Sequence, residues 1–370
     1  MDTLEIKGFK RFKDVSIPLN RITLLTGNNG SGKSSVIQSL LIYRNYAEAN
    51  KGNAIGREVR ISVNDGRRLD LGDFDTLVNP DSWNVTIRFN KEGIDLSSAA
   101  DDSGLVVAVP SLDDNGFIPE IMSNREFRYL NAERLSPRPD SKIRTEAQNF
   151  LTSGERGELA GNALMTVSKT FPKLDESRFC PGNNAQNFSI QIDAWMSYIF
   201  TDVAVKSEPL QPGYCRVVLR GHHYGSYVTA PNTGFGITYA LPVVIDGLAA
   251  AAGSMLIVEN PEAHLHPKAQ SNIGFFLGMM AAAGVKAVVE THSEHVVNGV
   301  RRALLYSDKI SHDDLSICFF PEQPLPSGEL FTHITMDRFG NLSDFPVDFF
   351  DQVRQDMREI MRLAKQNYEA

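Results

Sequence analysis

The chain has 370 residues, of which 42% are hydrophobic and 22% are charged, with a formal net charge of −8 and a pI near 5.6. This composition is typical of a globular protein with a substantial core, and the negative charge argues against a chain that binds polyanions over its whole surface, although it says nothing about local patches. Cys180, Cys215 and Cys318 form no CxxC pair and the N-terminus lacks an apolar signal core, so we expect no disulfide framework or thiolate zinc site, and a cytoplasmic location.

The first 95 residues predict a β-rich lobe with one helix. Alternating apolar residues or short apolar runs, typical of strands, occur near residues 4–6, 15–19, 22–26, 59–63 and 85–89. One apolar face over residues 33–46 predicts the helix.

The segment 96–210 is interrupted throughout by glycine and proline, and it predicts a mixed or helical insert. It contains one aromatic helical stretch near residues 192–200. We found no internal repeat and no heptad run long enough for a coiled coil. This insert is the expected place for contacts with partners, because the motifs described below lie outside it.

From residue 211 to 320, strands alternate with helices, which predicts an α/β sheet with a parallel part. The expected elements are a hairpin at 215–219 and 227–230, helices at about 236–252 and 268–283, and buried strands at 255–258 and 286–290. The apolar stretch 239–258 is about long enough to span a bilayer, but Pro242, Asp246 and Gly253–Ser254 interrupt it. We therefore expect a buried helix followed by a buried strand, and no membrane contact. The segment 321–370 is expected to end in a charged amphipathic helix.

The strongest motif is Gly27–Ser34, GNNGSGKS, which matches GxxxxGK[ST] between a predicted buried strand and a predicted helix. Glycines let backbone N–H groups wrap a phosphate closely, and the helix start adds free donors and partial positive charge. Lys33 is expected to reach the β- and γ-phosphates of ATP, and Ser34 to ligate Mg²⁺. The residues expected to bind ATP here are Asn28, Asn29, Gly30, Ser31, Gly32, Lys33, Ser34 and Ser35.

An acidic residue follows the predicted strand 255–258, in the sequence MLIVENPEAHLHP. Hydrolysis on a P-loop requires an acid at the end of another strand to hold Mg²⁺ and its water. Glu259 occupies this position, where aspartate is more common, and forms the predicted metal site with Ser34. The alternative is that Glu259 only caps a helix after a core strand.

The next predicted strand ends in Glu290-Thr291-His292-Ser293. A histidine at the tip of a strand beside the acidic one can contact the γ-phosphate or the attacking water, although most histidines in such places are structural. Glu259 and His292 are therefore candidate catalytic residues at these two strand ends.

Four histidines in this region form HxH and HxxH pairs, at positions 264, 266, 292 and 295. Two such pairs could hold zinc or a pair of metal ions. Both pairs lie where an ATPase requires other residues, so one P-loop explains the region with fewer assumptions.

Together these motifs resemble the ABC-type ATPases of the SMC, RecF and OLD kind, and among them the short bacterial AAA-family ATPases of phage-defence loci. The resemblance covers the opening LEIKGFKRFKDVSIPLNRITLLTGNNGSGKSS, then ENPEAHLHP and ETHSEH, and touches LGDFDTLV, YLNAERLSPR, NTGFGITYALPVV and GNLSDFPVDFFDQ. It implies an α/β P-loop NTPase fold with an ABC-like two-lobed head, a mixed sheet with flanking helices and a mainly helical insert. The segments predicted on this basis are a β-rich P-loop lobe (1–95), the insert (96–210), a lobe with the remaining motifs (211–320) and a C-terminal segment (321–370).

The resemblance also implies ATP sites between two copies, one supplying the P-loop and the other a signature sequence at a helix start. Here the signature would be residues 232–238, NTGFGIT, with Thr233, Gly234 and Gly236 as binding residues. It departs from the usual LSGGQ-like sequence, but glycines before a helix still expose backbone donors to an anion. An ordinary glycine-rich cap is the alternative.

Two further departures from the family pattern concern chemistry. Asp73 lies where a glutamine that senses metal and water is usual, and it could instead belong to a simple turn. Asn260 follows Glu259 where a catalytic glutamate is usual, and an amide cannot take a proton from water. We expect Glu290 or Glu262 to orient the water instead, or hydrolysis to be slow and the protein to act as a switch.

The sequence leaves two possible roles for the basic segment 8–13 and two for Arg134. Residues 8–13, GFKRFK, could bind nucleic acid, or could form a strand turn that contacts the adenine or phosphates of the same copy. Arg134 could anchor a phosphate or stabilise the lobe through a carboxylate.

The residues and the resemblance together predict an ATPase that dimerises around ATP, or forms a higher oligomer, and regulates a separately encoded effector, by preference a nuclease, in anti-phage defence. No nuclease motif is found, and the tail after His295 is too short for a Toprim-type domain. The alternative is a RecF-like repair ATPase that binds DNA or RNA directly, which the acidic charge disfavours. A transporter subunit fits worst, because the signature differs. The trigger and the effector stay open.

Overall fold

The structure is a computed structural model that describes the chain except residues 52, 54, 67, 100–104, 112–115, 125, 137, 139, 144–149, 171–172, 222–224, 233 and 370. The strands are β1 (Asp2–Phe9), β2 (Phe12–Leu19), β3 (Ile22–Gly27), β4 (Val59–Ser62), β5 (Val85–Phe89), β6 (Glu92–Ser98), β7 (Leu105–Pro110), β8 (Arg128–Leu130), β9 (Ser141–Lys142), β10 (Ala204–Gln211), β11 (Tyr214–Arg220), β12 (Val228–Thr229), β13 (Met255–Glu259), β14 (Lys286–Glu290), β15 (Leu315–Phe320) and β16 (Thr332–Ile334). The helices are α1 (Lys33–Ala49), α2 (Phe74–Leu77), α3 (Glu120–Ser123), α4 (Ala160–Thr170), α5 (Phe188–Phe200), α6 (Phe235–Ala249), α7 (Pro267–Ala282), α8 (Glu294–Tyr306) and α9 (Gln352–Glu369).

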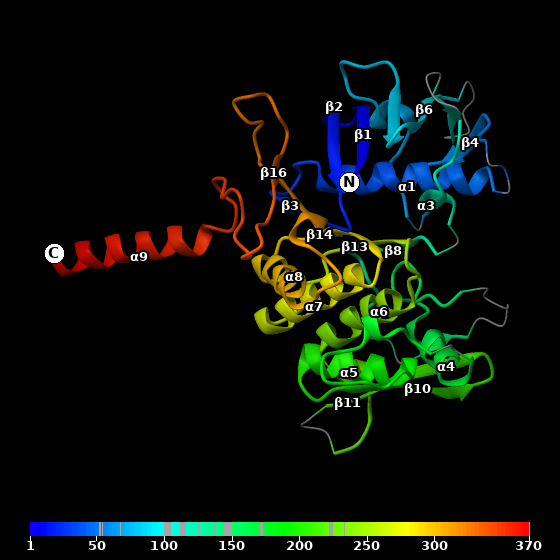
Figure 1. Cartoon of the computed structure of the whole chain (residues 1–370), viewed down its shortest axis with the longest axis vertical. Helices are drawn as coiled ribbons and strands as arrows, with labels where there is room; N and C mark the ends of the chain where they lie inside the picture. The colour runs from blue at the N-terminus through cyan, green and yellow to red at the C-terminus, as the bar shows by residue number, and fades with distance from the viewer. Residues whose placement is uncertain are drawn as a thin grey trace.

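A central sheet with the order β16-β15-β3-β14-β13-β8 organises the molecule (Figure 1). The five strands from β15 to β8 run parallel, and β16 is an antiparallel edge. Parallel strands bring their carboxyl ends to one edge, which is where ligands bind in open α/β sheets. Gly27, Glu259 and Glu290 end three of these strands, so the predicted motif residues meet at this edge. The fold is an α/β P-loop NTPase.

The central strands are buried on both faces, as their continuous apolar sequences require. Successive side chains point to opposite faces, so Leu24 belongs to one hydrophobic core and Leu25 to the other. Val258 and Ile257 divide in the same way. One core joins the sheet to α5, α6, α7 and α8, and the other joins it to α1 and the N-terminal sheet.

The N-terminal sheet is antiparallel, with the order β2-β1-β5-β6-β7-β4. Figure 1 shows α1 between this sheet and the central sheet, and a third layer beyond α6 and α7 that contains α4, α5, β10 and β11. The central sheet takes strands from all four predicted segments: β3, β8, β13 to β15, and β16. The insert contains both strands and helices. The limits of the four segments stay a prediction.

A fully buried ion pair connects the central sheet to α6. Arg128 on β8 and Asp246 on α6 are 3% and 1% exposed, and their Nη1 and Oδ1 atoms lie 2.7 Å apart. The Ser153 hydroxyl donates to the same carboxylate, and Arg128 also donates to the carbonyls of Leu151 and Ala249. Such a pair costs desolvation but orients α6 firmly, because removing one partner leaves a buried charge.

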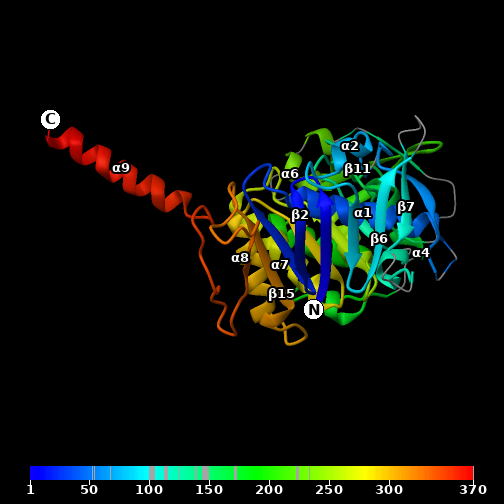
Figure 2. The same ribbon diagram turned by 90° about the horizontal axis from the view of Figure 1, so that it is seen from above.

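The C-terminal helix α9 extends away from the body, as Figures 1 and 2 show. It is the charged amphipathic helix expected from the sequence, and it begins at Gln352. The stretch 239–258 forms most of α6 and most of β13, so it is a buried helix followed by a buried strand, as predicted. Within the described parts of the chain, no helix combines the length and apolar character needed to cross a bilayer.

Candidate nucleotide site

The phosphate-binding loop joins β3 to α1, and its glycines are required by its geometry. Gly27 has φ 122°, and a Cβ there would lie 2.0 Å from the carbonyl oxygen of Phe320. Gly32 has φ 109°, and a Cβ there would lie 2.8 Å from the ring of Phe12. Residues with a side chain rarely adopt such φ values. The loop therefore follows the path that the motif predicts, with the start of α1 free of any side-chain cap.

A hollow of about 330 Å³ opens over this loop. Its lining includes Lys10, Arg11, Lys33, Ser34 and Glu290. Lys10 and Arg11 come from the β1–β2 turn, so the basic hairpin contributes positive charge to the P-loop hollow of its own copy. The Lys10 ammonium donates to the Gln38 side chain at 2.7 Å.

Lys33 folds back over the loop. Its Nζ donates to the carbonyls of Gly27 and Asn28, at 3.0 and 2.6 Å. Burial lowers the pKa of Lys33, and the nearby Glu290 carboxylate opposes that shift. Among the described residues, the direct partners of this buried cation are carbonyls, which it is suited to exchange for an anion.

Glu290 is the carboxylate that contacts the P-loop. The Ser34 hydroxyl lies 3.1 Å from each of its oxygens. Burial, followed by the charge of Glu259 on the neighbouring strand, raises the pKa of Glu290 to about 7, while Lys33 and Ser34 act in the opposite direction. The parallel register places Glu259 directly beside Glu290, so two carboxylates share this sheet edge.

Glu259 makes different contacts. Its oxygens accept hydrogen bonds from the Tyr129 hydroxyl and the Ala132 backbone N–H, both at 3.1 Å. Burial raises the pKa of Glu259, and these two donors oppose the shift. In this structure Ser34 is bonded to Glu290, and the predicted pairing of Ser34 with Glu259 across a metal stays a prediction.

Glu262 holds the turn after β14. One oxygen accepts from the Thr291 hydroxyl and the other from the His292 backbone N–H, both at 2.7 Å. His292 is half-buried, and burial and the charge of Lys33 lower its pKa, which favours a neutral imidazole. Glu262 thus positions the turn that carries His292.

Asn260 occupies a left-handed backbone conformation, with φ 44°. Asparagine adopts this region more readily than glutamate does, which gives a physical reason for the amide at this position. Its backbone N–H donates to the Glu290 carbonyl at 2.8 Å. Its side-chain Oδ1 is buried and has no hydrogen-bond partner among the described residues.

Arg134 lies against the turn after β13. Its guanidinium donates to the backbone carbonyls of Glu259, at 2.8 Å, and of Asn260, at 2.5 Å. It is 3% exposed, and burial lowers its pKa to about 10. Arg134 therefore clamps the turn after β13 through backbone carbonyls, and a role toward a phosphate stays a prediction. Arg134 also contacts α6, because its guanidinium lies 5.6 Å from the ring centroid of Tyr239. The Tyr239 ring in turn packs against His264.

The predicted signature lies at the exposed start of α6. Gly234 is the N-terminal cap, and nothing lies within 4 Å of the place where its Cβ would be. A Cβ on Gly236 would lie 2.7 Å from the His264 carbonyl oxygen, so α6 packs directly on that turn. Thr233 falls outside the described residues. Both glycines line a hollow of about 400 Å³ that shares no lining residue with the P-loop hollow.

The structure also bears on Asp73 and on the histidine pairs. Asp73 caps α2, where its side chain accepts from the Thr76 backbone N–H at 3.1 Å, which is the turn alternative. Among the described residues, no group of three or more His, Cys, Asp or Glu side chains is arranged to hold a metal ion, so the histidine pairs receive no support as a metal centre.

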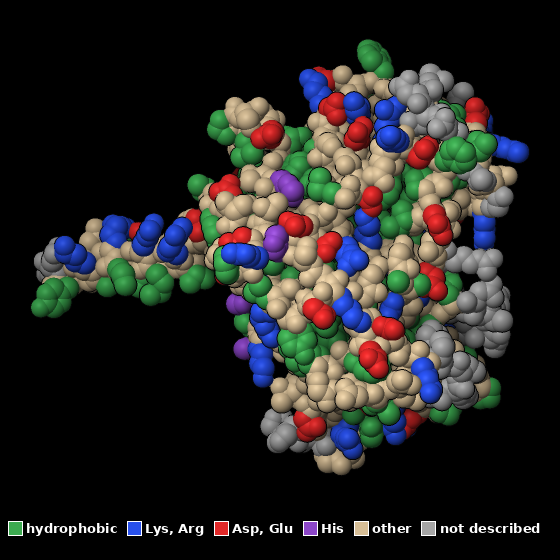
Figure 3. All heavy atoms as spheres, in the orientation of Figure 1, with side chains coloured by type: hydrophobic (Ala, Val, Ile, Leu, Met, Phe, Trp, Pro, Cys, Tyr) green, Lys and Arg blue, Asp and Glu red, His purple; other side chains and the backbone are tan. Residues whose placement is uncertain are grey.

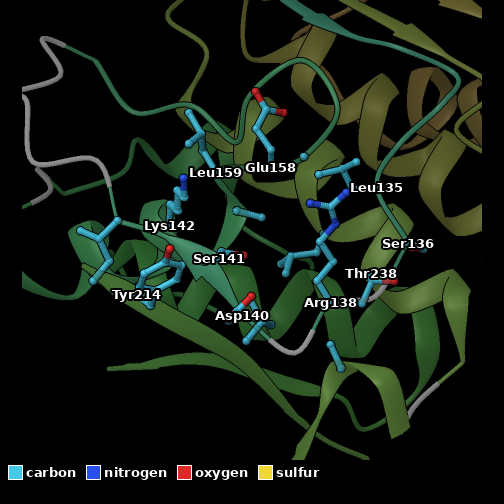
Figure 4. A pocket seen from close by; sticks show the side chains of 17 residues that line it. Leu135, Ser136, Arg138, Asp140, Ser141, Lys142, Glu158, Leu159, Tyr214 and Thr238 are labelled. Carbon is cyan, nitrogen blue, oxygen red and sulfur yellow. The ribbon is translucent and has the colours of Figure 1, made fainter. Parts of the chain in front are cut away.

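A third hollow, of about 490 Å³, lies between α4, α6 and β11. Figure 4 shows Arg138, Lys142, Glu158, Tyr214 and Thr238 around it. Thr238 is on the first turns of α6, so this hollow and the signature glycines share one helix. Its position between α4, α6 and β11 was not expected from the sequence.

Tyr129 is the main contact that sequence reasoning missed. It belongs to β8, which has three residues, so no periodic pattern was long enough to indicate a strand there. The segment YLNAERLSPR, which carries part of the family resemblance, supplies Tyr129, Ala132 and Arg134 to the same turn.

Two family models of ATPase domains match the chain. One, described as an AAA ATPase domain, matches residues 1–106, and another, described as an AAA domain, putative AbiEii toxin, Type IV TA system, matches residues 117–298. A third, described as a protein of unknown function, matches residues 310–360.

Known proteins are similar to parts of the chain. The OLD nuclease of Thermus scotoductus is 24% identical over 317 residues, which cover 78% of this chain and 58% of that protein. The chromosome partition protein Smc of Methanocaldococcus jannaschii is 27% identical over 95 residues, 25% of this chain and 8% of that protein. The chain thus spans little more than half of the first relative and a small part of the second. A solved Smc head bound to the C-winged helix domain of ScpA covers 90% of this chain and 97% of its own, with 13% identity and a TM-score of 0.48.

Proposed function

We propose that this chain, an ATPase of the SMC, RecF and OLD kind, binds ATP between two copies, hydrolyses it, and uses the dimer to regulate an effector. The observation that carries the proposal is the contact between Ser34 of the P-loop and Glu290, beside Glu259, at the carboxyl edge of the central sheet. Phosphate-binding and acidic groups from distant parts of the sequence meet there, as ATP hydrolysis requires.

The P-loop hollow suits the phosphates of ATP. Lys10, Arg11 and Lys33 supply positive charge along its lining, and the loop of residues 28–32 presents backbone donors at the start of α1. Ser34 and Glu259 would hold Mg²⁺, which would supply positive charge against the phosphates. A hydroxyl and a carboxylate are oxygen ligands of the kind that Mg²⁺ prefers.

Glu290 is the better candidate than Glu262 for the residue that takes a proton from water. Both oxygens of Glu262 are occupied by Thr291 and His292. Glu290 lines the hollow, and its pKa of about 7 matches the working range of a general base. Asn260 cannot take this proton, because an amide is not a base in this range.

The exposed start of α6 supports a site completed by a second copy. Gly234 and Gly236 face a hollow separate from the P-loop hollow, so in this arrangement they do not line the ATP site of their own chain. A second copy related by a twofold axis could offer its α6 start to the phosphates, where free backbone donors stabilise an anion.

The regulatory part of the proposal is supported by the relatives alone. One is named a nuclease and one matching family is described as a putative toxin of a Type IV TA system. We propose a separately encoded effector of the nuclease class, in anti-phage defence, with this chain in the cytoplasm. Cleavage of linear DNA by the purified chain alone would contradict a separate effector.

The direct test is mass by light scattering with and without ATP and Mg²⁺, with phosphate release measured in parallel. We expect wild type to dimerise with ATP and Glu290→Gln to dimerise without releasing phosphate. Lys33→Ala is expected to lose ATP binding. If Lys33→Ala binds ATP as tightly as wild type, the site assignment is wrong.

The signature assignment has its own matched pair of variants. Gly234→Asp adds a negative charge at the start of α6, so we expect ATP binding to persist and the dimer to be lost. Gly225→Asp is the control, because nothing lies near its Cβ position either and it belongs to neither hollow. Equal dimerisation of both variants would remove the signature from the proposed interface.

A further inference from the structure

The C-terminal helix α9 presents an apolar stripe to solvent. Val353, Met357, Ile360, Met361 and Tyr368 are 73%, 49%, 57%, 66% and 93% exposed. Val353, Met357 and Met361 follow at four-residue steps, Ile360 lies three residues after Met357, and Tyr368 lies seven after Met361, so all five lie on one side of the helix. Figure 3 shows hydrophobic side chains along one side of α9 and Lys and Arg side chains along the other.

The body of the same copy does not cover this stripe. Every described side chain of α9 is exposed, and the helix projects away from the rest of the molecule (Figures 1 and 2). Helices in proteins gain most of their stability by packing an amphipathic face against a partner, and α9 has no such contact with the described body of its own copy. A row of exposed apolar side chains on such a helix marks an interaction surface.

The base of α9 lies at the candidate nucleotide site. Asp348, Phe350, Asp351 and Gln352 line a hollow of about 680 Å³ together with the P-loop residues 27–29 and His292. This is the face that a second copy must approach to complete the proposed ATP site. The helix therefore leaves the body at the edge of that interface.

Charge is divided between α9 and the segment before it. Arg354, Arg358, Arg362 and Lys365 lie on the flank of the helix next to the apolar stripe, because they recur at three- and four-residue steps. Arg362 also pairs with Glu359 of the same helix at 2.6 Å. The acidic neck, residues 321–351, contains six acidic residues and one basic residue. A basic flank on one copy thus complements an acidic neck on another.

The acidic neck and the end of α8 also carry exposed apolar side chains. Leu305, Tyr306, Phe339, Phe345 and Val347 are 54%, 61%, 69%, 68% and 77% exposed. Phe339 is close to α8, because the next residue, Gly340, accepts a hydrogen bond from Arg301 at 3.0 Å. This surface offers an apolar counterpart for the stripe beside the acidic charge.

We propose that α9 is an arm that packs on a second copy of this chain, with its apolar stripe on the neck and α8 end of that copy and its basic flank against the acidic neck. The inference rests on the proposed function, because it assigns a second copy to the face at the base of α9. ATP binding itself does not depend on it.

The test compares the double variant Met357→Asp/Met361→Asp with the control Gln355→Asp/Gln366→Asp, which adds the same charge to the opposite side of α9. All of these residues are exposed, so folding is preserved, and thermal unfolding verifies it. Dimerisation with ATP and Mg²⁺ is measured by light scattering over a concentration series, and ATP binding by calorimetry. We expect the apolar-side variant to bind ATP like wild type but to dimerise at least about tenfold more weakly, a loss of about 1.4 kcal/mol, while the control matches wild type.

The outcomes separate the two proposals. If wild type binds ATP without dimerising, the proposed dimeric site fails. If wild type dimerises and Met357→Asp/Met361→Asp dimerises equally well, the dimer stands but α9 contacts another protein or surface, and the arm proposal is wrong. Weakening by Arg354→Glu/Arg358→Glu that disappears at high salt would support the electrostatic half of the contact.

Discussion

Replacing Glu290 by glutamine should stabilise the nucleotide-free protein, and only at higher pH. The pKa of this carboxyl is raised from 4.5 to about 7 in the folded protein, so the folded state holds the proton more tightly than the unfolded state does. The protonated carboxyl therefore adds to the free energy of unfolding. This contribution is present in full below about pH 4.5 and is lost as the pH rises through about 7. Glutamine resembles the protonated acid and does not lose this contribution.

The magnitude follows from the shift. About 2.5 pKa units correspond to roughly 3 kcal/mol, and we expect about 2 kcal/mol of added stability at about pH 8 after relaxation around Ser34. For a chain of this size, that amounts to a rise in Tm of roughly 3 °C. Near pH 5 the two proteins should be almost equally stable.

The measurement is differential scanning calorimetry without nucleotide or Mg²⁺, from about pH 5 to about pH 8. Glu329→Gln is a matched control, because Glu329 is exposed and also accepts a hydrogen bond from a serine, Ser327, at 3.0 Å. A stability difference that does not change with pH, or a glutamine variant that is less stable at about pH 8, would refute the account of Glu290.

Two further predictions concern residues that hold the site in place. Arg134→Lys should retain ATP binding but lower the rate of phosphate release by about tenfold, because lysine cannot bridge the two carbonyls after β13 as a guanidinium does; an unchanged rate would show that the clamp is dispensable. Arg128→Met should destabilise the protein by about 3 kcal/mol or more by leaving Asp246 buried and unpaired. Arg128→Met/Asp246→Leu should recover most of that loss in denaturant unfolding, and failure to recover any would mean that Arg128 acts through its carbonyl contacts instead.

The sequence predicted the local elements around the motifs well. The strand before Gly27, the helix after it and the strands that end at Glu259 and Glu290 are confirmed, because each has a strong apolar pattern and a clear terminus. The α/β P-loop fold follows from the same patterns. The sequence analysis does not predict β8 or α8. A strand of three residues is too short to show a period, and the residues at the start of α8 are interpreted there only as a histidine motif.

Side-chain partners within the site could not be predicted in the same way. The contact of Ser34 with Glu290 joins residues 256 positions apart, and it depends on β14 lying between β3 and β13. No local period encodes that strand order. Tyr129 and the Arg134 clamp depend on β8 joining the far side of β13, so their contacts with residues 259 and 260 appear only when the sheet is assembled.

The place of β3 in the central sheet has a consequence for how the protein is made. Its two neighbours are β14 (Lys286–Glu290) and β15 (Leu315–Phe320), so during synthesis the P-loop strand emerges from the ribosome long before either neighbour exists. Closing such distant contacts is slow, and both edges of an apolar strand are open to wrong pairing meanwhile. The nucleotide site therefore cannot be completed until residues up to Phe320 have been made, and the apolar edges of β3 lack their neighbours until then.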